Sequence, residues 1–345
     1  MSDPVALSAG AEDGGHGAED HFEHWLVNRA NAARDPISES SAKPYRYMWR
    51  AWCRWLASAG GRDEPVHWLL ATSEHAQRYL QQGPSPAAST RKSSTAPISD
   101  ITRQRYQRFL HILYMHALHR GLVRESPFAG AEDPLSVQEQ SEGQIFHAIQ
   151  LQAIAESLPS GTQRMDVRDR AIMCVLLDAA ITTSELCQLR LQHVGGHLSK
   201  VSLSIDGKRS AQVRKLQLQP RASAALRHWM EIRRGITVTR PGEEDVVFVS
   251  KKGRAMTNHS IFHLVSTTVR QAFKAHHLDM PNHIGAQVLR NSRLVHWLNA
   301  GMPVDEVVRR AGFKDQKSFR GLRGHIDPAV LQPLRVRTHG PASAK

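Results

Sequence analysis

Apolar residues recur at helical spacing through the first third of the chain. In the stretch 21–33 they fall at i, i+3, i+4 and i+8, and these residues are Phe22, Trp25, Leu26 and Ala30. A second stripe at 45–56 is formed by Tyr45, Trp49, Trp52, Cys53 and Leu56. Similar patterns at 74–82 and 101–122, the latter ended by Gly121, predict two more helices.

Two breaks divide this pattern. The stretch 83–99 is rich in Pro, Ser and Thr and predicts an exposed loop, whereas 127–144 is dominated by Gly, Glu, Asp, Ser and Pro. Residues 1–20 are small and acidic, with almost nothing to bury. We therefore predict five segments: a disordered tail 1–20, a helical domain 21–127, a linker 128–145, a second domain 146–336 and a tail 337–345.

The second half mixes helices with short strands. Residues 201–205 and 213–218 alternate apolar and polar positions around Asp206-Gly207-Lys208, which predicts a hairpin. A third short strand is predicted at 246–249, closed by a basic turn at 250–253. The predicted helices of this half are 150–158, 167–180, 260–275, 285–300 and 304–311. The fold class is mainly α with a small antiparallel sheet (α+β).

Bulk composition excludes several classes of protein. Hydrophobic residues make up 41% and charged residues 22% of the 345 residues, which is typical of a globular chain rather than a disordered one. No run of 18 apolar residues is present, so no membrane span and no membrane partner are expected. Cys53, Cys174 and Cys187 have no CxxC or zinc-like spacing, and we interpret them as reduced thiols of a cytoplasmic protein.

The charge balance indicates a polyanionic partner. Lys and Arg number 45 against 32 Asp and Glu, a net charge of +13. A solvated basic surface or a membrane-surface protein would also fit this number. Its distribution favours nucleic acid, because the stretch 251–323 carries thirteen basic residues and only four acids, Asp279, Asp305, Glu306 and Asp315.

Several segments, taken in the order in which they follow one another along the chain, resemble the tyrosine recombinase (phage integrase) family over roughly 22–325. The stretch from Arg168 to Leu189, with its Thr183-Ser184-Glu185-Leu186 turn, is similar to the opening of the family's catalytic domain. The stretch from Gln287 to Asn291, onward to Gly301 and then to Ala311-Gly312-Phe313, is similar in spacing to its later motifs. The resemblance implies a core-binding domain that clamps DNA, followed by a catalytic domain.

In that family a tyrosine attacks the scissile phosphate, two arginines stabilise the developing charge, and a lysine and a histidine move protons. Carried over position by position, the resemblance implies that three residues are retained: Glu185, Lys208 and Arg290. It implies that the first arginine is replaced by Thr182 and the histidine of the HxxR motif by Gln287. Phe313 stands at the later His or Trp position, and the nucleophile position falls at Leu322 or Arg323.

The absence of the nucleophile does not depend on alignment. All five tyrosines lie in the first half of the chain: Tyr45, Tyr47, Tyr79, Tyr106 and Tyr114. Loss of one preorganised donor already costs about 10²–10³ in rate, and such groups act as a unit. We therefore expect no strand cleavage by this chain, which makes it a pseudoenzyme of the family.

The residues expected to contact DNA are basic and clustered. They are Arg46, Arg50, Arg54, Arg103, Arg105, Arg108, Lys208, Lys252, Arg254, Arg290 and Arg293. Each has an alternative interpretation. The arginines of 46–54 and 103–108 can be solvated faces, Lys208 a polar hairpin tip, Arg290 a buried structural arginine and Glu185 a structural helix residue. No cofactor is expected, and none of the 20 histidines has a convincing metal-site spacing.

Three functions remain open at this point. The first is a DNA-binding relative without cleavage, acting as an accessory or architectural protein beside active recombinases of the same mobile element. The second is an active recombinase with an unusual or trans-donated nucleophile, and the third is a transcriptional or replication regulator. The resemblance implies double-stranded DNA as the partner, homo- or hetero-oligomers on that DNA, and a nucleoid-associated bacterial location. It also implies that the base-reading helices lie within 101–122 and 258–274. The segment 314–323 is expected to dock on a neighbouring subunit or on DNA.

Overall fold

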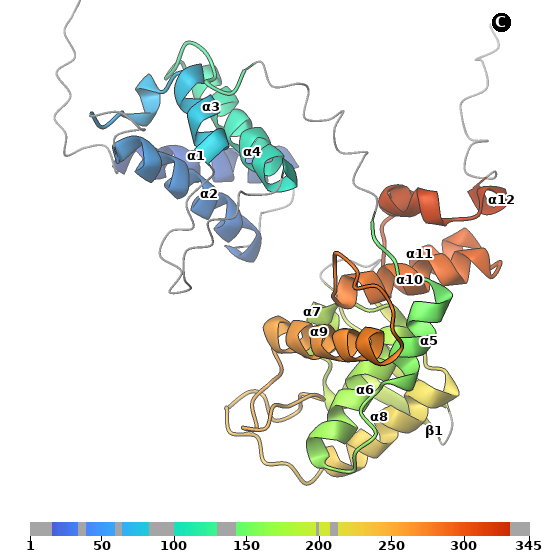
Figure 1. Cartoon of the computed structure of the whole chain (residues 1–345). Coiled ribbons are helices and arrows are strands. Elements are labelled where there is room, and N and C mark those ends of the chain that lie inside the picture. The colour runs from blue at the N-terminus through green and yellow to red at the C-terminus, as the bar shows by residue number, and fades with distance from the viewer. Residues whose placement is uncertain are drawn as a thin grey trace, which may run out of the picture. The chain divides into compact units, whose positions relative to one another are not determined.

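The computed structural model describes residues 16–33, 39–58, 64–82, 100–129, 143–197, 200–207 and 213–331. The chain divides into two compact units, Met1–Gln138 and Glu139–Lys345. Both are rich in helices, and the second adds one three-stranded antiparallel sheet (Figure 1). This architecture confirms the predicted fold class.

All regular elements among the described residues of the first unit are helices. Its elements are α1 (His16–Ala33), α2 (Glu39–Ala57), the 3₁₀ helix η1 (Trp68–Leu70), α3 (Ser73–Gln82) and α4 (Asp100–His119). The predicted aromatic stripe of α2 is its buried face, since Trp49 and Trp52 are almost fully inaccessible. Trp52 donates its indole N–H to the Tyr114 hydroxyl at 3.0 Å, and that hydroxyl donates to the Trp68 carbonyl at 2.7 Å. Trp52 and Tyr114 thus pair their polar atoms inside the aromatic core, whereas Trp68 Nε1 and the Tyr79 hydroxyl are buried without a hydrogen-bond partner among the described residues.

Two boundaries of the predicted segments differ from the structure. Helix α1 begins at His16, inside the segment assigned to the tail, and Ala18 is already buried against Trp49, whose indole donates to the Ala18 carbonyl at 2.7 Å. Phe128, assigned to the linker, is 4% exposed and belongs to the core of the first unit. Both errors have one cause: a few apolar residues in a polar segment were not recognised as core contacts. The predicted loop 83–99 and most of the linker lie outside the described residues.

Gly121 ends α4 in the predicted way. It adopts φ +68°, a left-handed conformation that only glycine reaches at no steric cost. This turn brings the Leu122 amide to the Ala117 carbonyl at 3.0 Å and so pairs a carbonyl of the last helical turn.

The second unit is assembled around two long helices, α6 and α8, which run side by side (Figure 1). Its helices are α5 (Ala148–Glu156), α6 (Arg164–Ala179), α7 (Thr183–Gln188), α8 (Pro220–Arg233), α9 (Asn258–Ala275), α10 (Ala286–Asn299), α11 (Val304–Ala311) and α12 (Pro328–Leu331). Two 3₁₀ helices, η3 (Leu191–His193) and η5 (Gln316–His325), complete the helical elements.

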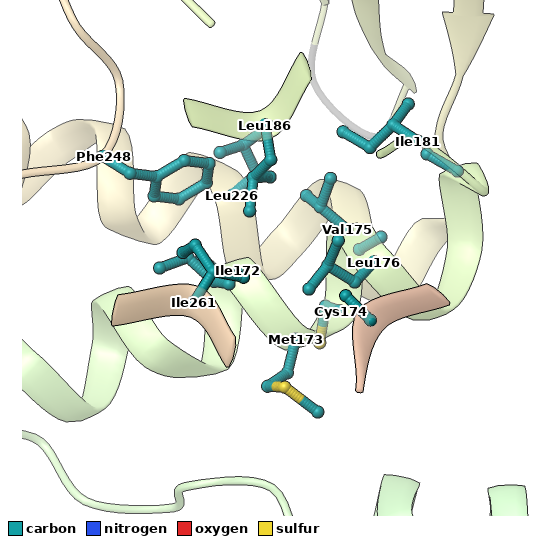
Figure 2. Packing of buried hydrophobic residues seen from close by; sticks show 14 of the residues in the cluster. Ile172, Met173, Cys174, Val175, Leu176, Ile181, Leu186, Leu226, Phe248 and Ile261 are labelled. Atoms are coloured by element: carbon teal, nitrogen blue, oxygen red, sulfur yellow. The ribbon is translucent and has the colours of Figure 1, made fainter. Parts of the chain in front are cut away.

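Helix α6 is buried on most of its circumference and is the centre of this core. Ile172 and Val175 are fully inaccessible, and side chains from α7, α8 and α9 close around them (Figure 2). Leu186, Leu226 and Ile261 supply these contacts, each from a different helix. Burial of such side chains contributes about 1.5–3 kcal/mol each, which makes α6 the main support of the domain.

The sheet has the order β1-β2-β3 and consists of β1 (Val194–His197), β2 (Lys200–Ile205) and β3 (Arg214–Gln217). The predicted hairpin is therefore correct, but the predicted third strand at 246–249 is wrong. Val246 and Val249 form only isolated bridges, to Arg190 and Ala255. The strand that completes the sheet is instead β1. It contains Gly195 and Gly196, and glycine carries no strand signal in a sequence.

The inward face of β3 also differs from the expected one. Arg214 and Leu216 are buried, whereas Val213, expected to begin the strand, is 61% exposed. Leu203 of β2 pairs with Leu216 and is fully buried, which fixes this register. Lys208 lies outside the described residues.

Helix α8 was not predicted. Its buried residues Ala222, Leu226, Trp229 and Arg233 follow helical spacing, and Pro220 occupies the first turn, so the signal was present. The pattern was obscured by Arg233, a charged residue among the buried positions. The Arg233 guanidinium donates to the carbonyls of Val246 and Glu244 at 2.8 and 2.7 Å and so holds the segment mistaken for a strand.

A buried histidine joins α1 to α4 in the first unit. His21 is 1% exposed, its Nε2 lies 3.1 Å from the Leu113 carbonyl, and its ring stacks on Trp68 with centroids 4.8 Å apart. Its Nδ1 lies 3.4 Å from the Arg120 guanidinium. Burial, assisted by the nearby His116 and Arg120 charges, lowers the pKa of His21 from 6.5 to about 4.

We predict that the first unit loses stability in mild acid through His21. The unfolded chain takes up the proton near pH 6.5, and the folded chain only near pH 4, so stability falls as the pH decreases between these values. The loss amounts to roughly 3 kcal/mol once both pKa values are passed. Urea unfolding followed by tryptophan fluorescence measures it, because five of the seven tryptophans, Trp25, Trp49, Trp52, Trp55 and Trp68, lie in this unit.

The matched pair of variants is His21→Gln and His119→Gln. Glutamine at 21 keeps a donor for the Leu113 carbonyl but cannot titrate, so the acid loss should largely disappear. His119 is exposed on α4, and its replacement should leave the loss intact. Equal pH profiles for wild type and His21→Gln would show that His21 is not the responsible group.

Candidate functional site

The candidate site begins at the turn between α6 and α7. Ala180 ends α6 with φ +50° and is fully buried, an uncommon conformation for a residue with a Cβ. Thr182 follows as the N-cap of α7, and its hydroxyl accepts the Glu185 amide at 3.1 Å. The Glu185 carboxylate accepts in turn from the Thr182 amide at 2.7 Å and from its hydroxyl at 3.0 Å. This reciprocal capping box fixes the Glu185 side chain.

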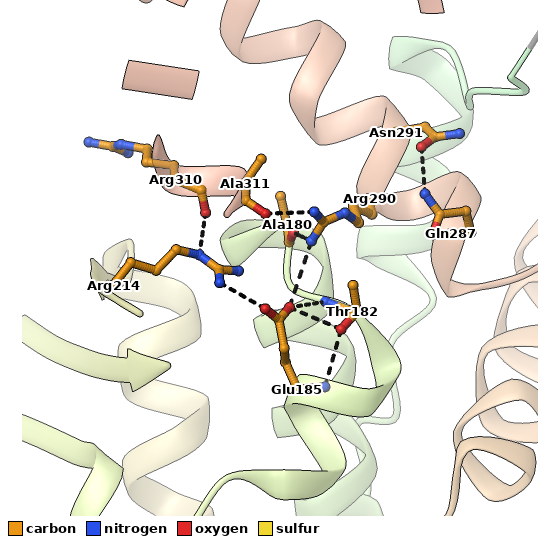
Figure 3. A network of polar contacts seen from close by, with 9 residues as sticks. All are labelled: Ala180, Thr182, Glu185, Arg214, Gln287, Arg290, Asn291, Arg310 and Ala311. Carbon is orange, nitrogen blue, oxygen red and sulfur yellow. Dashed lines mark hydrogen bonds and ion pairs between the residues drawn. The ribbon is translucent and has the colours of Figure 1, made fainter. Parts of the chain in front are cut away.

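The carboxylate of Glu185 is the centre of a buried polar network (Figure 3). Arg214 Nη1 donates to its Oε1 at 2.7 Å, and Arg290 Nη1 lies 3.8 Å from its Oε2. Burial raises the pKa of Glu185, but the hydrogen bonds from Arg214 and Thr182 and the two guanidinium charges outweigh it. The net pKa lies below the ordinary value, so the group stays ionised.

Arg214 reaches the network from β3. Its side chain is only 1% exposed, and its Nε donates to the Arg310 carbonyl at the end of α11 at 2.7 Å. Gly312 makes room for it, since a Cβ at this position would lie 2.6 Å from Arg214 Nη1. One guanidinium therefore connects β3, α7 and α11.

Arg290 enters from α10 and is 5% exposed. Its guanidinium donates to the Ala180 carbonyl and, at 2.7 Å, to the Ala311 carbonyl. The Phe313 ring covers it, with the guanidinium carbon 5.2 Å from the ring centroid. Burial lowers the pKa of Arg290 to about 10, although Glu185 opposes the shift. The arginine remains protonated at neutral pH, with its donors turned to the protein interior.

The positions expected to have lost catalytic groups surround this network. Gln287 is exposed on α10 and donates to the Asn291 side chain at 2.8 Å. Phe313 makes an edge contact with Phe319 at 5.3 Å between centroids. Leu322 is 5% exposed and belongs to an apolar cluster of α10, α11 and η5, and Arg323 beside it is exposed. Of the two residues at which the resemblance places the nucleophile, Leu322 therefore lies in the core and Arg323 at the surface.

Chemically, the network holds charge but offers no free nucleophile. It contains two guanidinium groups against one carboxylate, and the Thr182 hydroxyl is engaged both as donor and as acceptor. Each guanidinium is anchored by a main-chain carbonyl. These bonds suit a structural junction between helices and strand.

The predicted DNA contacts of the first unit fall into two groups. Arg46 and Arg50 are paired with carboxylates of α1 and α2, and Arg103 donates to Asp100 at 2.8 Å and to the Leu80 carbonyl at 3.1 Å. Arg54 and Arg105 are exposed, and Arg108 is half-buried. Among the described residues these last three make no ion pair.

The predicted DNA contacts of the second unit also divide into exposed residues and residues held by other protein groups. Lys252 and Arg254 are exposed in the turn before α9. Arg293 donates to the Asp178 carboxylate at 2.8 Å and to its carbonyl at 3.1 Å, and its guanidinium lies over Trp297. Arg290 belongs to the buried network, which favours the structural alternative for that residue. Lys208 lies outside the described residues, so the structure gives it no place.

Arg214 is the member of the network that the sequence analysis missed. The available signal was the alternation of β3: counting back by two from Leu218 and Leu216 leads to position 214 on the buried side. A buried arginine needs hydrogen-bond or charged partners, and Glu185 was already a candidate. Among the described residues no group of three or more potential metal ligands occurs, and no helix there is long and apolar enough to cross a membrane.

The comparisons with known proteins agree with the fold of the second unit. The sequence profile of the phage integrase family matches residues 144–320. The tyrosine recombinase XerC of Alcanivorax borkumensis is 25% identical over 246 residues, which cover 70% of this chain and 69% of that protein. XerD of Pseudomonas putida is 29% identical over 176 residues, covering 50% and 54%.

Solved structures share the fold at low sequence identity. The XerH site-specific recombinase bound to its difH substrate superposes with a TM-score of 0.66 at 14% identity, covering 90% of this chain and 83% of that one. The Tn1549 transposon integrase in complex with a circular intermediate DNA gives 0.66 at 15% identity, covering 90% and 95%.

We predict that Arg214→Gln destabilises the second unit by about 3 kcal/mol, because it leaves a buried carboxylate without its main partner. Hydrogen exchange of the α6 amides measures this loss in the second unit alone. Lys215→Gln, at the exposed neighbouring position of the same strand, is the matched control and should cost little.

The double variant Glu185→Gln/Arg214→Gln should recover part of the loss, since a neutral amide needs no counter-charge. If Arg214→Gln exchanges as slowly as Lys215→Gln, the network does not stabilise the domain.

Proposed function

The chain belongs to the phage integrase family, the family of the tyrosine recombinases, and on this premise we propose that it binds double-stranded DNA in recombination or integration without cleaving it. The observation that carries the proposal is the absence of any tyrosine after Tyr114. The family's matched region is 144–320, and neither this region nor residues 321–345 contain the residue that forms the family's covalent intermediate.

The surroundings of the nucleophile position support this proposal. Leu322 is buried in an apolar cluster, and no hydroxyl or thiol can replace it without repacking that cluster. Thr182 caps a helix at the position of the first arginine, and Phe313 offers no hydrogen bond at the position of a proton donor. Three separate contributions to phosphoryl transfer are thus missing, each for a local structural reason.

DNA binding is supported by a one-signed surface. The stretch 251–275, which contains the turn before α9 and α9 itself, has no acidic residue. Lys252, Arg254, Arg270 and Lys274 are exposed on it. Such a surface gains affinity for phosphates by releasing condensed counterions. Arg54, Arg105 and Arg108 are the corresponding candidates of the first unit.

A partner is required if the chain takes part in recombination without cleaving. We propose that active recombinases of the same mobile element supply the tyrosine and that this chain occupies a neighbouring position on the DNA as an accessory protein. A covalent adduct would instead favour an active recombinase with an unusual nucleophile. Specific binding without dependence of any recombinase on this chain would favour a regulator.

We predict a salt-sensitive complex with DNA and no covalent product. The test uses nicked duplexes from the gene's own neighbourhood, which trap a covalent intermediate, and compares native with denaturing gels. The expected result is a shifted band on the native gel and only free DNA on the denaturing gel. A band that survives denaturation would contradict the absence of cleavage, and no shift at low salt would contradict DNA binding.

We also predict that Lys252→Gln/Arg254→Gln weakens binding and lowers the slope of log K against log salt by about 1.8, since each phosphate contact contributes about 0.9. The matched control is Arg227→Gln/Arg234→Gln, which removes the same charge from exposed positions on and just after α8. If both pairs lower the slope equally, binding follows net charge and not the surface of 251–275.

A further inference from the structure

Two arginines of α2 are held by carboxylates of α1. Arg46 donates from Nε and Nη2 to Glu23 Oε1 at 3.1 and 2.9 Å, and from Nη1 to Glu39 Oε1 at 2.7 Å. Arg50 donates from Nε and Nη2 to the two oxygens of Glu19 at 2.5 and 3.0 Å. Arg54, the third arginine of the predicted DNA-binding row on α2, differs from these two. It is exposed and makes no ion pair among the described residues.

The pairing is built into the register of the two helices. Glu19 and Glu23 are one turn apart on α1, and Arg50 and Arg46 are one turn apart in the opposite order on α2, as expected for antiparallel neighbours. Helix α1 is fixed by its apolar side, on which Phe22 is fully buried and Trp25 is 4% exposed. The two glutamates therefore cannot leave the arginines by a simple movement of the helix.

These contacts use the same donors that a DNA backbone would use. A guanidinium binds the two oxygens of a carboxylate in the geometry in which it binds two phosphate oxygens. One partner of each pair is exposed: the Arg50 side chain is 54% exposed and the Glu23 side chain 49%, whereas Arg46 is 18% exposed. Exposed pairs of this kind are weak enough for another anion to displace.

We propose that Glu19 and Glu23 act as a built-in competitor for DNA phosphates, which holds Arg50 and Arg46 and lowers the affinity of the first unit for DNA. The inference rests on the proposed function, because it regulates the DNA-binding surface of that proposal. On this proposal, DNA binding by the first unit requires DNA phosphates to replace the glutamate carboxylates on these arginines. Of the three arginines Arg46, Arg50 and Arg54, only Arg54 would meet DNA without first breaking an ion pair with another described residue.

The test is the variant Glu19→Gln/Glu23→Gln in the full chain, titrated with a fluorescent duplex between 50 and 200 mM salt. Arg50 becomes available, whereas Arg46 keeps its pair with Glu39 at 2.7 Å, so affinity at low salt should rise and the salt slope should steepen by about 0.9. The variant should therefore lose about threefold more affinity than wild type across this range. Its melting temperature should stay within a few degrees of wild type, since exposed pairs stabilise little.

Two controls separate this effect from a change of net charge. Glu64→Gln/Glu125→Gln removes two exposed carboxylates of the same unit that hold no arginine of α2. In the background Arg46→Gln/Arg50→Gln, the substitutions at 19 and 23 should have no effect beyond that of this control.

Each outcome is decisive. A steeper slope for Glu19→Gln/Glu23→Gln alone supports the competitor. A slope equal to that of the Glu64/Glu125 control overturns it while DNA binding stands. If neither wild type nor the variant binds the duplex at 50 mM salt, both the competitor and the proposed function are overturned.

Discussion

The carboxylate of Glu185 is the contact on which the second unit's candidate site depends. It is partly buried and ionised, and it is held by a helix N-terminus on one side and by two guanidinium groups on the other. Arg214 and Arg290 then extend the network to the ends of α6 and α11 through main-chain carbonyls. A charge buried in this way must keep its partners, because an uncompensated one costs several kcal/mol. The same bonds that stabilise the junction turn its positive charge inward.

This arrangement is compatible with the proposal that the chain keeps the recombinase fold without cleaving DNA. Thr182 and Leu322 are not vacant positions: one caps α7 and the other fills an apolar cluster. Phe313 covers Arg290 with its ring. Each of these side chains therefore satisfies the fold locally. The positive charge that would serve DNA then lies elsewhere, on the acid-free turn and helix of 251–275.

The sequence was a good guide wherever burial follows periodicity. The aromatic stripe of α2, the hairpin of β2 and β3 and the glycine at the end of α4 were all predicted from spacing. It was a poor guide where a polar residue occupies a core position. Arg214 and Arg233 are both buried and both interrupt an apolar pattern, which hid the inward face of β3 and the whole of α8. Pairing partners far apart in sequence, such as Glu19 with Arg50, follow from tertiary packing and have no local signal at all.

The central claim is that the chain binds DNA through surface cations while the Glu185 network stays closed. A structure of the full chain on a duplex that shifts it tests this most directly. The account predicts that Arg214 remains on Glu185 and Arg290 on the carbonyls of Ala180 and Ala311, with phosphates against exposed groups such as Lys252 and Arg254. A phosphate oxygen accepting hydrogen bonds from Arg290, with Glu185 released, would contradict it.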